Sequence, residues 1–333
     1  MHDQVRRGTP HFKIKDAGKV EITEDDERIF LDLYRHGILD AHTIRQLLPT
    51  RSEDWLGRRL RKLTDAGYLC RPRQQRRLHK LGGGSHPLCY TLANGAARHL
   101  KARFNLPVRT DRWRTTTGAL SSLHIEHSLE QGRFMVQLRL AVERHAKTMA
   151  FEYPDQIFAR LKPALLKKQQ HPLIFATRVN WHGWHEKEST IPDGFCALRY
   201  IDAPPEKSSR YLFIEIDRGT ETIEPSARNL RGDKLFRGNS LLRKLVVYGQ
   251  GFLAGSHTAL FGIPTFQVLV VTTTGERVRQ MIEAYQKHLT GPLYRVPPVR
   301  FLFVDIETLV AQQNRILTCP LCDGLARPIT LLG

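Results

Sequence analysis

The stretch SEDWLGRRLRKLTDAGYL, residues 52–69, determines how the N-terminal third of the chain is expected to fold. Ser52 is a favourable helix N-cap, and apolar residues recur behind it at helical spacing. The apolar positions are Trp55, Leu56, Leu60 and Leu63. The basic positions, which we expect to remain outside, are Arg58, Arg59, Arg61 and Lys62. This pattern predicts an amphipathic helix with one buried side and one cationic side.

Two shorter helical segments precede this helix. Residues 23–37, TEDDERIFLDLYRHG, start with Thr23 as a candidate N-cap and an acidic first turn, and they end at Gly37. A second short helix is expected from Asp40 to Pro49, separated from the first only by residues 37–39. Two short helices joined so tightly are typical of a helix-turn-helix, in which the next helix enters the DNA major groove.

A β-hairpin is expected directly after these helices. Tyr68 and Leu69 start one strand, and residues 88–92 alternate back as a second. The loop between them carries basic residues and no acid up to residue 80: Arg71, Arg73, Arg76, Arg77 and Lys80. Three helices followed by a hairpin with a basic loop predict a winged helix-turn-helix, whose wing contacts the backbone or minor groove of double-stranded DNA. A solvated charged face and a protein-binding module remain alternatives.

The overall composition supports an anionic partner. Lys and Arg number 51 against 33 Asp and Glu, which gives a formal net charge of +18. Nucleic acid is the commonest polyanion, because neutralised phosphates release counterions. No run approaches the roughly 18 apolar residues of a transmembrane helix, so no membrane role is expected. The polar first residues and five scattered cysteines predict a cytoplasmic protein.

The length of 333 residues favours two domains. We expect a disordered basic arm over residues 1–20 and a winged-helix domain over residues 21–104. A proline-containing polar linker follows at residues 105–118. Apolar strand-like runs and helical segments then predict an α/β domain with a mixed sheet over residues 119–310, followed by a C-terminal tail at residues 311–333. The predicted class is therefore α+β.

Three acidic residues in the second domain are suited to metal chemistry. Asp193 enters one predicted strand, and Glu215 and Asp217 alternate along another, so that the last two point the same way. Carboxylates of this kind bind Mg²⁺ together with water and phosphate, and Lys244 on a following helix could stabilise the transition state. Alternatively, Glu215 and Asp217 form a charge network with Arg218, Arg243 or Lys244 that joins the helix to the sheet.

These residues also carry a family resemblance. The segments IPDGF at 191–195, FIEIDRGTE at 213–221 and LLRKLVVYGQ at 241–250, behind a winged helix, resemble the replication-relaxation family of plasmid and integrative-element proteins. The resemblance extends from about residue 23 to residue 309. It implies a role in plasmid replication or mobilisation, in some members as MobC-like accessory factors, and a C-terminal part similar to the PD-(D/E)XK nuclease fold.

The resemblance also assigns candidate catalytic residues. Asp193 matches the first acid of the nuclease pattern and Glu215 the second, but Asp217 stands where the family pattern has lysine. Lys244 could replace that lysine, and Glu126 or Glu130 on a long helix could supply a further acid. The expected function is a DNA-binding accessory protein. The alternatives are a Mg²⁺-dependent or Mn²⁺-dependent DNA endonuclease or nickase, and a module that recruits a relaxase or replication initiator.

Three further groups of residues give weaker signals. Cys319 and Cys322 have the spacing of half a zinc site, but no second pair follows, and we expect no zinc. The aromatic loop at residues 180–185 could stack on bases, but packing against the sheet edge is the simpler interpretation. His124 and its polar neighbours at helical spacing could bind a metal or lie on a solvated face.

Overall fold

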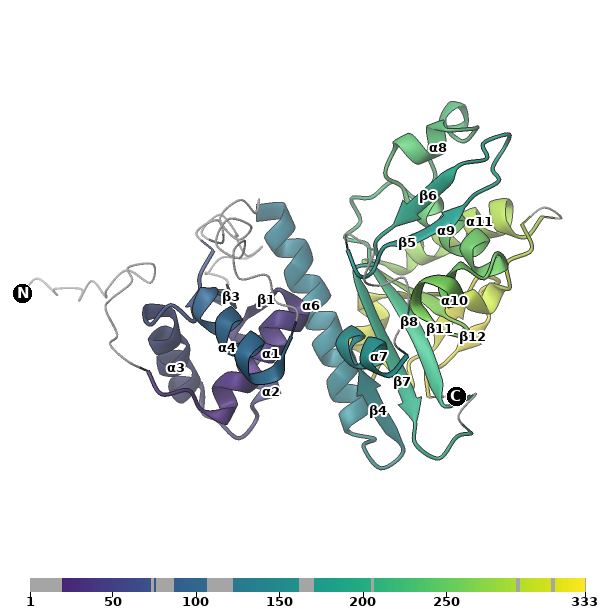
Figure 1. Cartoon of the computed structure of the whole chain (residues 1–333). Helices are drawn as coiled ribbons and strands as arrows, with labels where there is room; N and C mark the ends of the chain where they lie inside the picture. Colours follow the sequence, from purple (N-terminus) through teal and green to yellow (C-terminus); the bar gives the residue numbers. More distant parts are fainter. Residues whose placement is uncertain are drawn as a thin grey trace, which may run out of the picture. The chain divides into compact units, whose positions relative to one another are not determined.

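The computed structural model describes residues 20–72, 75, 87–106, 122–161, 171–204, 207–291, 294–312 and 315–332. The chain divides into two compact units, Met1–Val136 and Gln137–Gly333, and the boundary falls within the long helix α6, Ser122–Glu143 (Figure 1). The expected basic arm, apart from Val20, and most of the expected linker lie outside the described residues.

The first unit alternates helices with short strands. Strands β1, β3 and β2 form a three-stranded antiparallel sheet in that order. The elements in chain order are α1 Glu24–His36, β1 Ile38–Asp40, α2 Ala41–Leu47, α3 Glu53–Asp65, β2 Leu69–Cys70, β3 Cys89–Leu92 and α4 Asn94–Phe104. The helices and the two hairpin strands expected from the sequence are present, whereas β1 between the first two helices was not expected.

The starts of these helices follow from their capping residues. At α1, Asp26 Oδ2 accepts hydrogen bonds from the backbone N–H and the hydroxyl of Thr23, both at 2.8 Å. Asp40 accepts from the N–H of Thr43 at α2 (2.7 Å). Ser52 accepts from the N–H of Trp55 at α3 (3.2 Å). Each of the bonds from a backbone N–H satisfies a donor that a helix start would otherwise leave unpaired.

The first half of α6 belongs to this unit. Ile125 and Leu129 pack with Ile38 and Cys89 in one buried cluster. The expected second domain began at residue 119, but the described part of α6 up to residue 136 clusters with the first unit instead. The sequence shows one continuous helix there and gives no sign of where its packing partner changes.

The second unit is built on a mixed seven-stranded sheet, as predicted for an α+β protein. Its strand order is β12-β11-β10-β9-β8-β7-β4. Strands β8, β9 and β10 are parallel to one another, and the remaining neighbours are antiparallel. The strands are β4 Met149–Glu152, β7 Gly194–Tyr200, β8 Ser209–Ile216, β9 Gln267–Thr272, β10 Phe301–Asp305, β11 Leu321–Asp323 and β12 Pro328–Ile329.

The last two strands occupy a part of the sequence that was expected to be a tail. Cys322 pairs with Phe303 of β10, and Leu321 pairs with Ile329 of β12. These strands are only three and two residues long, and Pro328 lies within one of them. Such short segments carry no visible alternation, so their sequence resembles a loop.

Helices and a separate hairpin surround this sheet. One face is covered by apolar side chains of α9 and α11, and its core includes Phe213, Val268 and Phe303. A hairpin of β5 and β6 packs on α9. The elements are α7 Pro154–Leu161, β5 Phe175–Arg178, β6 Lys187–Thr190, α8 Lys234–Arg237, α9 Leu241–Leu253, α10 Ser256–Phe261, α11 Gly275–Leu289 and α12 Ile306–Ala311. None of the described helices is both long and apolar enough to cross a bilayer.

Candidate functional site

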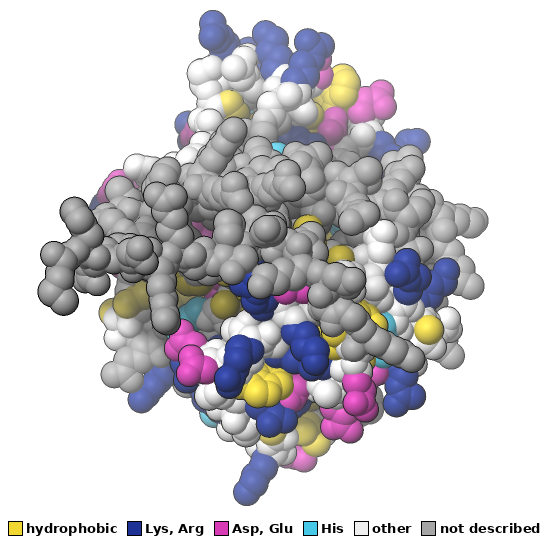
Figure 2. Space-filling model, turned by 90° about the vertical axis from the view of Figure 1, so that its left-hand side faces the viewer, with side chains coloured by type: hydrophobic (Ala, Val, Ile, Leu, Met, Phe, Trp, Pro, Cys, Tyr) yellow, Lys and Arg dark blue, Asp and Glu magenta, His cyan; other side chains and the backbone are white. Residues whose placement is uncertain are grey.

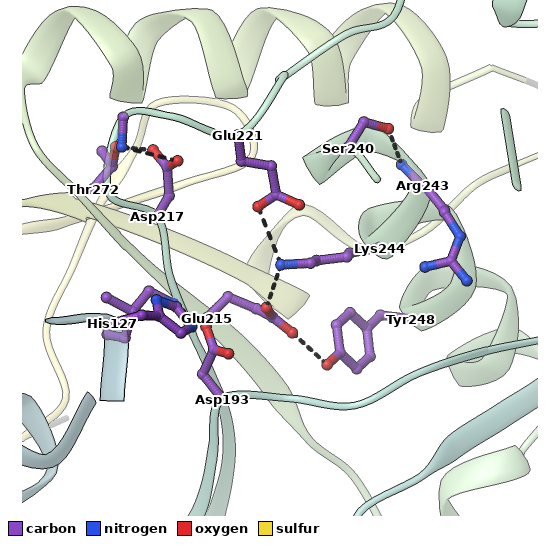
Figure 3. Close-up of polar contacts among 12 residues, drawn as sticks. His127, Asp193, Glu215, Asp217, Glu221, Ser240, Arg243, Lys244, Tyr248 and Thr272 are labelled. Carbon is purple, nitrogen blue, oxygen red and sulfur yellow. Dashed lines mark hydrogen bonds and ion pairs between the residues drawn. The ribbon is translucent and has the colours of Figure 1, made fainter. Parts of the chain in front are cut away.

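Glu215 is the centre of a polar group at the carboxyl end of β8. Residues alternate along the strand, so Glu215 faces α9 on the same side as Phe213 and is only 2% exposed. Its Oε1 accepts a hydrogen bond from the hydroxyl of Tyr248 (2.6 Å), and its Oε2 lies 3.0 Å from the ammonium of Lys244 (Figure 3).

Helix α9 supplies both partners. Ser240 caps this helix by accepting a hydrogen bond from the N–H of Arg243 (3.3 Å). Lys244 and Tyr248 then lie one turn apart on the same face of the helix. Lys244 also contacts Glu221 Oε2 at 3.1 Å, so its ammonium bridges a strand residue and a residue of the following loop.

Asp193 lies next to Glu215. It immediately precedes β7, the antiparallel neighbour of β8, and its Oδ2 accepts a hydrogen bond from the N–H of Ile216 (2.7 Å). Asp193 is half-buried, and its charge helps to raise the pKa of Glu215. The two acids that the sequence selected are therefore brought together by strand pairing.

The electrostatics of this group are set mainly by burial. Burial raises the pKa of Glu215 to about 7, Asp193 acts in the same direction, and Lys244 and the Tyr248 hydrogen bond oppose the rise. Burial disfavours the charged form of Lys244, but Glu215, Glu221 and Asp193 raise its pKa above the usual value. These effects favour the cationic form of Lys244, whereas they favour the neutral form of Glu215 more than in an exposed carboxyl group.

Asp217 is held in a separate ion pair. Its Oδ2 accepts from the hydroxyl of Thr272 (2.5 Å) and from Arg277 Nε (2.8 Å), and its Oδ1 accepts from Arg277 Nη2 (3.0 Å). A bidentate arginine occupies this carboxylate. Among the described residues, no three His, Cys, Asp or Glu side chains are grouped so that they could hold a metal ion. The expected three-carboxylate cluster is therefore not assembled.

The sequence did not identify Arg277 as a partner of this site. It lies 60 residues after Asp217, near the start of α11. The sequence pointed to this contact only indirectly, because it predicted a helix after the strand at residues 267–272 that would pack back against the sheet. Arg218, Arg243 and Lys244 were the expected partners of the acids, and of these Lys244 contacts Glu215. Arg243 instead donates to the carbonyl oxygen of Ser189 at 2.8 Å.

Two of the three expected carboxylates, those of Asp193 and Glu215, lie near one another, with Tyr248 and Lys244 against the oxygens of Glu215. Magnesium typically takes one or two protein carboxylates and completes its shell with water and substrate phosphate. Asp193 and Glu215 could supply them, and Glu221 Oε1 is buried without a hydrogen-bond partner in the described structure. Glu126 and Glu130, the proposed additional acids, lie on the part of α6 that clusters with the first unit.

The basic residues of α3 divide into two groups. Arg58 and Lys62 are exposed on the side of the helix opposite to Leu56, Leu60 and Leu63. Arg59 instead points inward and forms an ion pair with fully buried Asp26, to which its Nε donates at 2.8 Å. The expectation that all four basic residues remain outside is thus wrong for Arg59, because α1 places the buried carboxylate of Asp26 beneath it.

Arg61 and the wing residues are the other basic positions expected to contact DNA. Arg61 is half-buried and lies 3.6 Å from Asp65. Arg71 is 8% exposed, with its guanidinium over the ring of Tyr90 at 5.3 Å. The other expected wing residues, Arg73, Arg76, Arg77 and Lys80, lie outside the described residues. Figure 2 shows exposed Lys and Arg side chains with acidic side chains among them.

The remaining candidates occupy structural positions. Trp181 is completely buried, and its indole N–H donates to the carbonyl oxygen of Leu230 (2.6 Å). Cys319 is buried and Cys322 is partly buried; both are free thiols whose pKa is raised mainly by burial. Trp181 thus packs, as the simpler interpretation of the aromatic loop predicted.

Comparison with known proteins gives one match. The family model described as replication-relaxation matches residues 30–240, more than half of the chain. The matched range includes Asp193, Glu215 and Asp217 and ends four residues before Lys244. Neither a search of curated proteins nor a search of solved structures finds a match.

Proposed function

The chain belongs to the replication-relaxation family, and from this premise we propose that it is a DNA-binding accessory protein. The family associates the chain with replication or relaxation of a plasmid or similar element. Its N-terminal unit would bind duplex DNA as a winged helix-turn-helix, with α3 in the major groove. A relaxase or replication initiator is the expected protein partner, and the cytoplasm is the expected compartment.

The observation that carries this proposal is the arrangement around α3. Helices α1, α2 and α3 precede a hairpin of β2 and β3, and β1 completes the sheet, which is the element order of a winged helix. Arg58 and Lys62 project from the exposed side of α3 and form no ion pair within the described structure. They are therefore available for phosphates or base edges, unlike Arg59.

The experiment compares two substitutions on the same helix. The full-length Arg58→Ala/Lys62→Ala variant should lose about 10-fold to 100-fold in duplex affinity, because each charge-assisted contact contributes about 1 kcal/mol or more. Fluorescence anisotropy at fixed salt measures this loss. Arg59→Met is the matched control and should lower the unfolding free energy through unpaired Asp26, with little loss of affinity at a temperature where it remains folded.

The opposite pattern would exclude this docking surface. If affinity falls in the Arg59 variant and not in the Arg58 and Lys62 variant, α3 does not present its exposed side to DNA. Failure of the wild-type protein to bind duplex DNA at low salt would overturn the DNA-binding proposal as a whole.

We propose metal-dependent DNA cleavage as a second candidate function, because Lys244 reaches Glu215 at 3.0 Å. This lysine would take the role of the one that the nuclease pattern places where Asp217 stands. Asp193 and Glu215 would hold Mg²⁺ or Mn²⁺, and the bound cation would stabilise charge on a phosphoryl oxygen. Lys244 would contact the phosphate, and Tyr248 would fix the orientation of Glu215.

Supercoiled plasmid tests this second function. With Mg²⁺ or Mn²⁺, the wild-type protein should convert it to the nicked form, and Asp193→Asn and Lys244→Met should each reduce the rate at least 100-fold. Asp217→Asn should retain nicking wherever it remains folded, because its carboxylate is bound by Arg277. Gel retardation without nicking by any preparation would leave only the DNA-binding function.

A further inference from the structure

The second unit carries a basic segment that none of the functions above uses. Residues 227–237 lie between β8 and α9 and contain the exposed side chains of Arg228, Arg231 and Lys234. None of these three forms an ion pair with the described residues. The acid within the segment, Asp233, is paired with Arg237.

This segment is fixed to the body of the unit. Leu235 is 1% exposed, and Leu230 packs against the main core. The carbonyl oxygen of Leu230 accepts the hydrogen bond from the indole of Trp181 at the end of β5–β6, so the hairpin touches the segment. Apolar anchors therefore point inward while cationic side chains point outward, which limits the entropy lost when an anion binds.

The hairpin itself presents an unfavourable pair of charges. Arg178 on β5 lies directly opposite Lys187 on β6, and both are exposed and without an ion pair in the described structure. Like charges placed opposite one another destabilise a strand pair. The hairpin tip is nevertheless held in place, since Gln250 of α9 exchanges two hydrogen bonds with the backbone of Asn180. An anionic ligand would offset this repulsion.

We propose that this surface, formed by the basic segment 227–237 and the β5–β6 hairpin, binds the phosphate backbone of duplex DNA. The inference rests on the proposed DNA-binding function and gives the second unit a DNA contact of its own. In the sequence the segment lies between Glu221 and Ser240, the N-cap of α9.

The test uses a charge-matched pair of full-length variants. Arg228→Ala/Arg231→Ala/Lys234→Ala removes three charges from the segment. Arg144→Ala/Lys147→Ala/Lys207→Ala removes three exposed charges from the same unit, near the α6–β4 turn and the β7–β8 loop. Figure 1 places α8 and the hairpin at one end of this unit and the α6–β4 turn at the other.

Duplex affinity is then measured as a function of salt concentration. Each lost phosphate contact reduces the slope of log K against log salt by about 0.9, so the segment variant should lower it by about 2 to 3 and the control variant should match the wild type. A slope equal to that of the wild type in the segment variant, or an equal reduction in both variants, would overturn the inference.

Lysine acetylation gives a second readout that needs no substitution. Bound duplex should protect Lys187 and Lys234 from acetylation, as read by mass spectrometry, and leave Lys147 and Lys207 reactive. Equal reactivity of all four with DNA bound would contradict the inference. Failure of the inference differs from failure of the proposed function, because in the first case the wild type still binds DNA and the Arg58 and Lys62 variant still loses affinity.

Discussion

Several buried acids in the described part of this protein are matched with a base. Asp26 pairs with Arg59 and Asp217 with Arg277, and in both cases the carboxylate is almost fully buried. An ionised carboxylate without a partner is strongly disfavoured in the protein interior. Some of the 51 basic residues are therefore used inside the fold, so a count of basic residues alone overestimates the surface that could bind DNA.

Glu215 should make the stability of the protein depend on pH. Its pKa is raised from 4.5 to about 7 in the folded state. The folded state then binds more protons than the unfolded state between these values, so the unfolding free energy should fall as pH rises through this window. The difference in unfolding free energy between pH 5 and pH 8 should be smaller in Glu215→Gln than in the wild type by about 1 to 3 kcal/mol. Chemical denaturation at the two pH values measures this difference.

A surface acid provides the control for this experiment. Glu307→Gln replaces an exposed acid on α12 and should leave the pH dependence as in the wild type. Parallel curves for the wild type and the Glu215 variant would show that Glu215 stays ionised throughout this range, with Lys244 outweighing burial.

Single residues of the site were predictable where local spacing placed them. The alternation along β8 and the helical spacing on α9 identified Glu215 and Lys244, because one strand and one helix are enough to define these faces. The inward orientation of Arg59 and the capture of Asp217 by Arg277 depend on residues 33 and 60 positions away. Periodicity and spacing within one helix or strand cannot predict contacts between residues so far apart in the sequence.

At the scale of elements, close approach of backbones decides where α6 packs. A Cβ atom at Gly132 would lie 2.8 Å from Leu39 Cδ2 and 3.1 Å from the carbonyl oxygen of Ile38. A glycine is therefore needed at this position, and Arg133 adds an ion pair to the buried carboxylate of Asp40 at 2.6 Å. Both contacts fasten the first half of α6 to β1.

Two helical glycines should therefore respond to alanine in opposite ways. Gly132→Ala should lower the unfolding free energy by about 1 to 3 kcal/mol, because the added methyl overlaps with β1. Gly57→Ala on α3 should raise it by about 0.5 to 1 kcal/mol, because nothing lies within 4 Å and alanine favours the helix. Thermal melts of both variants measure the two effects, and equal signs would contradict the packing described for α6.

The whole molecule combines a net charge of +18 with cationic groups in both units. If the exposed bases of α3 and of segment 227–237 act together, at least five phosphates are neutralised. Duplex affinity should then fall by about 500-fold or more between 50 and 200 mM salt. A titration by fluorescence anisotropy over this range measures the change. A salt-independent affinity would show that the charge excess does not act on DNA.

The sequence by itself determined the local elements and the class of the protein. Helix caps, apolar periodicity and strand alternation act over a few residues, and together with the family motifs they were enough for an α+β chain with a mixed sheet and for the Asp193–Glu215–Lys244 group. Only the tertiary structure decided which acids meet which bases, how α6 divides between the two units, and that the last residues extend the sheet. Those outcomes depend on packing between segments far apart in the chain, where burial sets the energies and no short pattern records the partner.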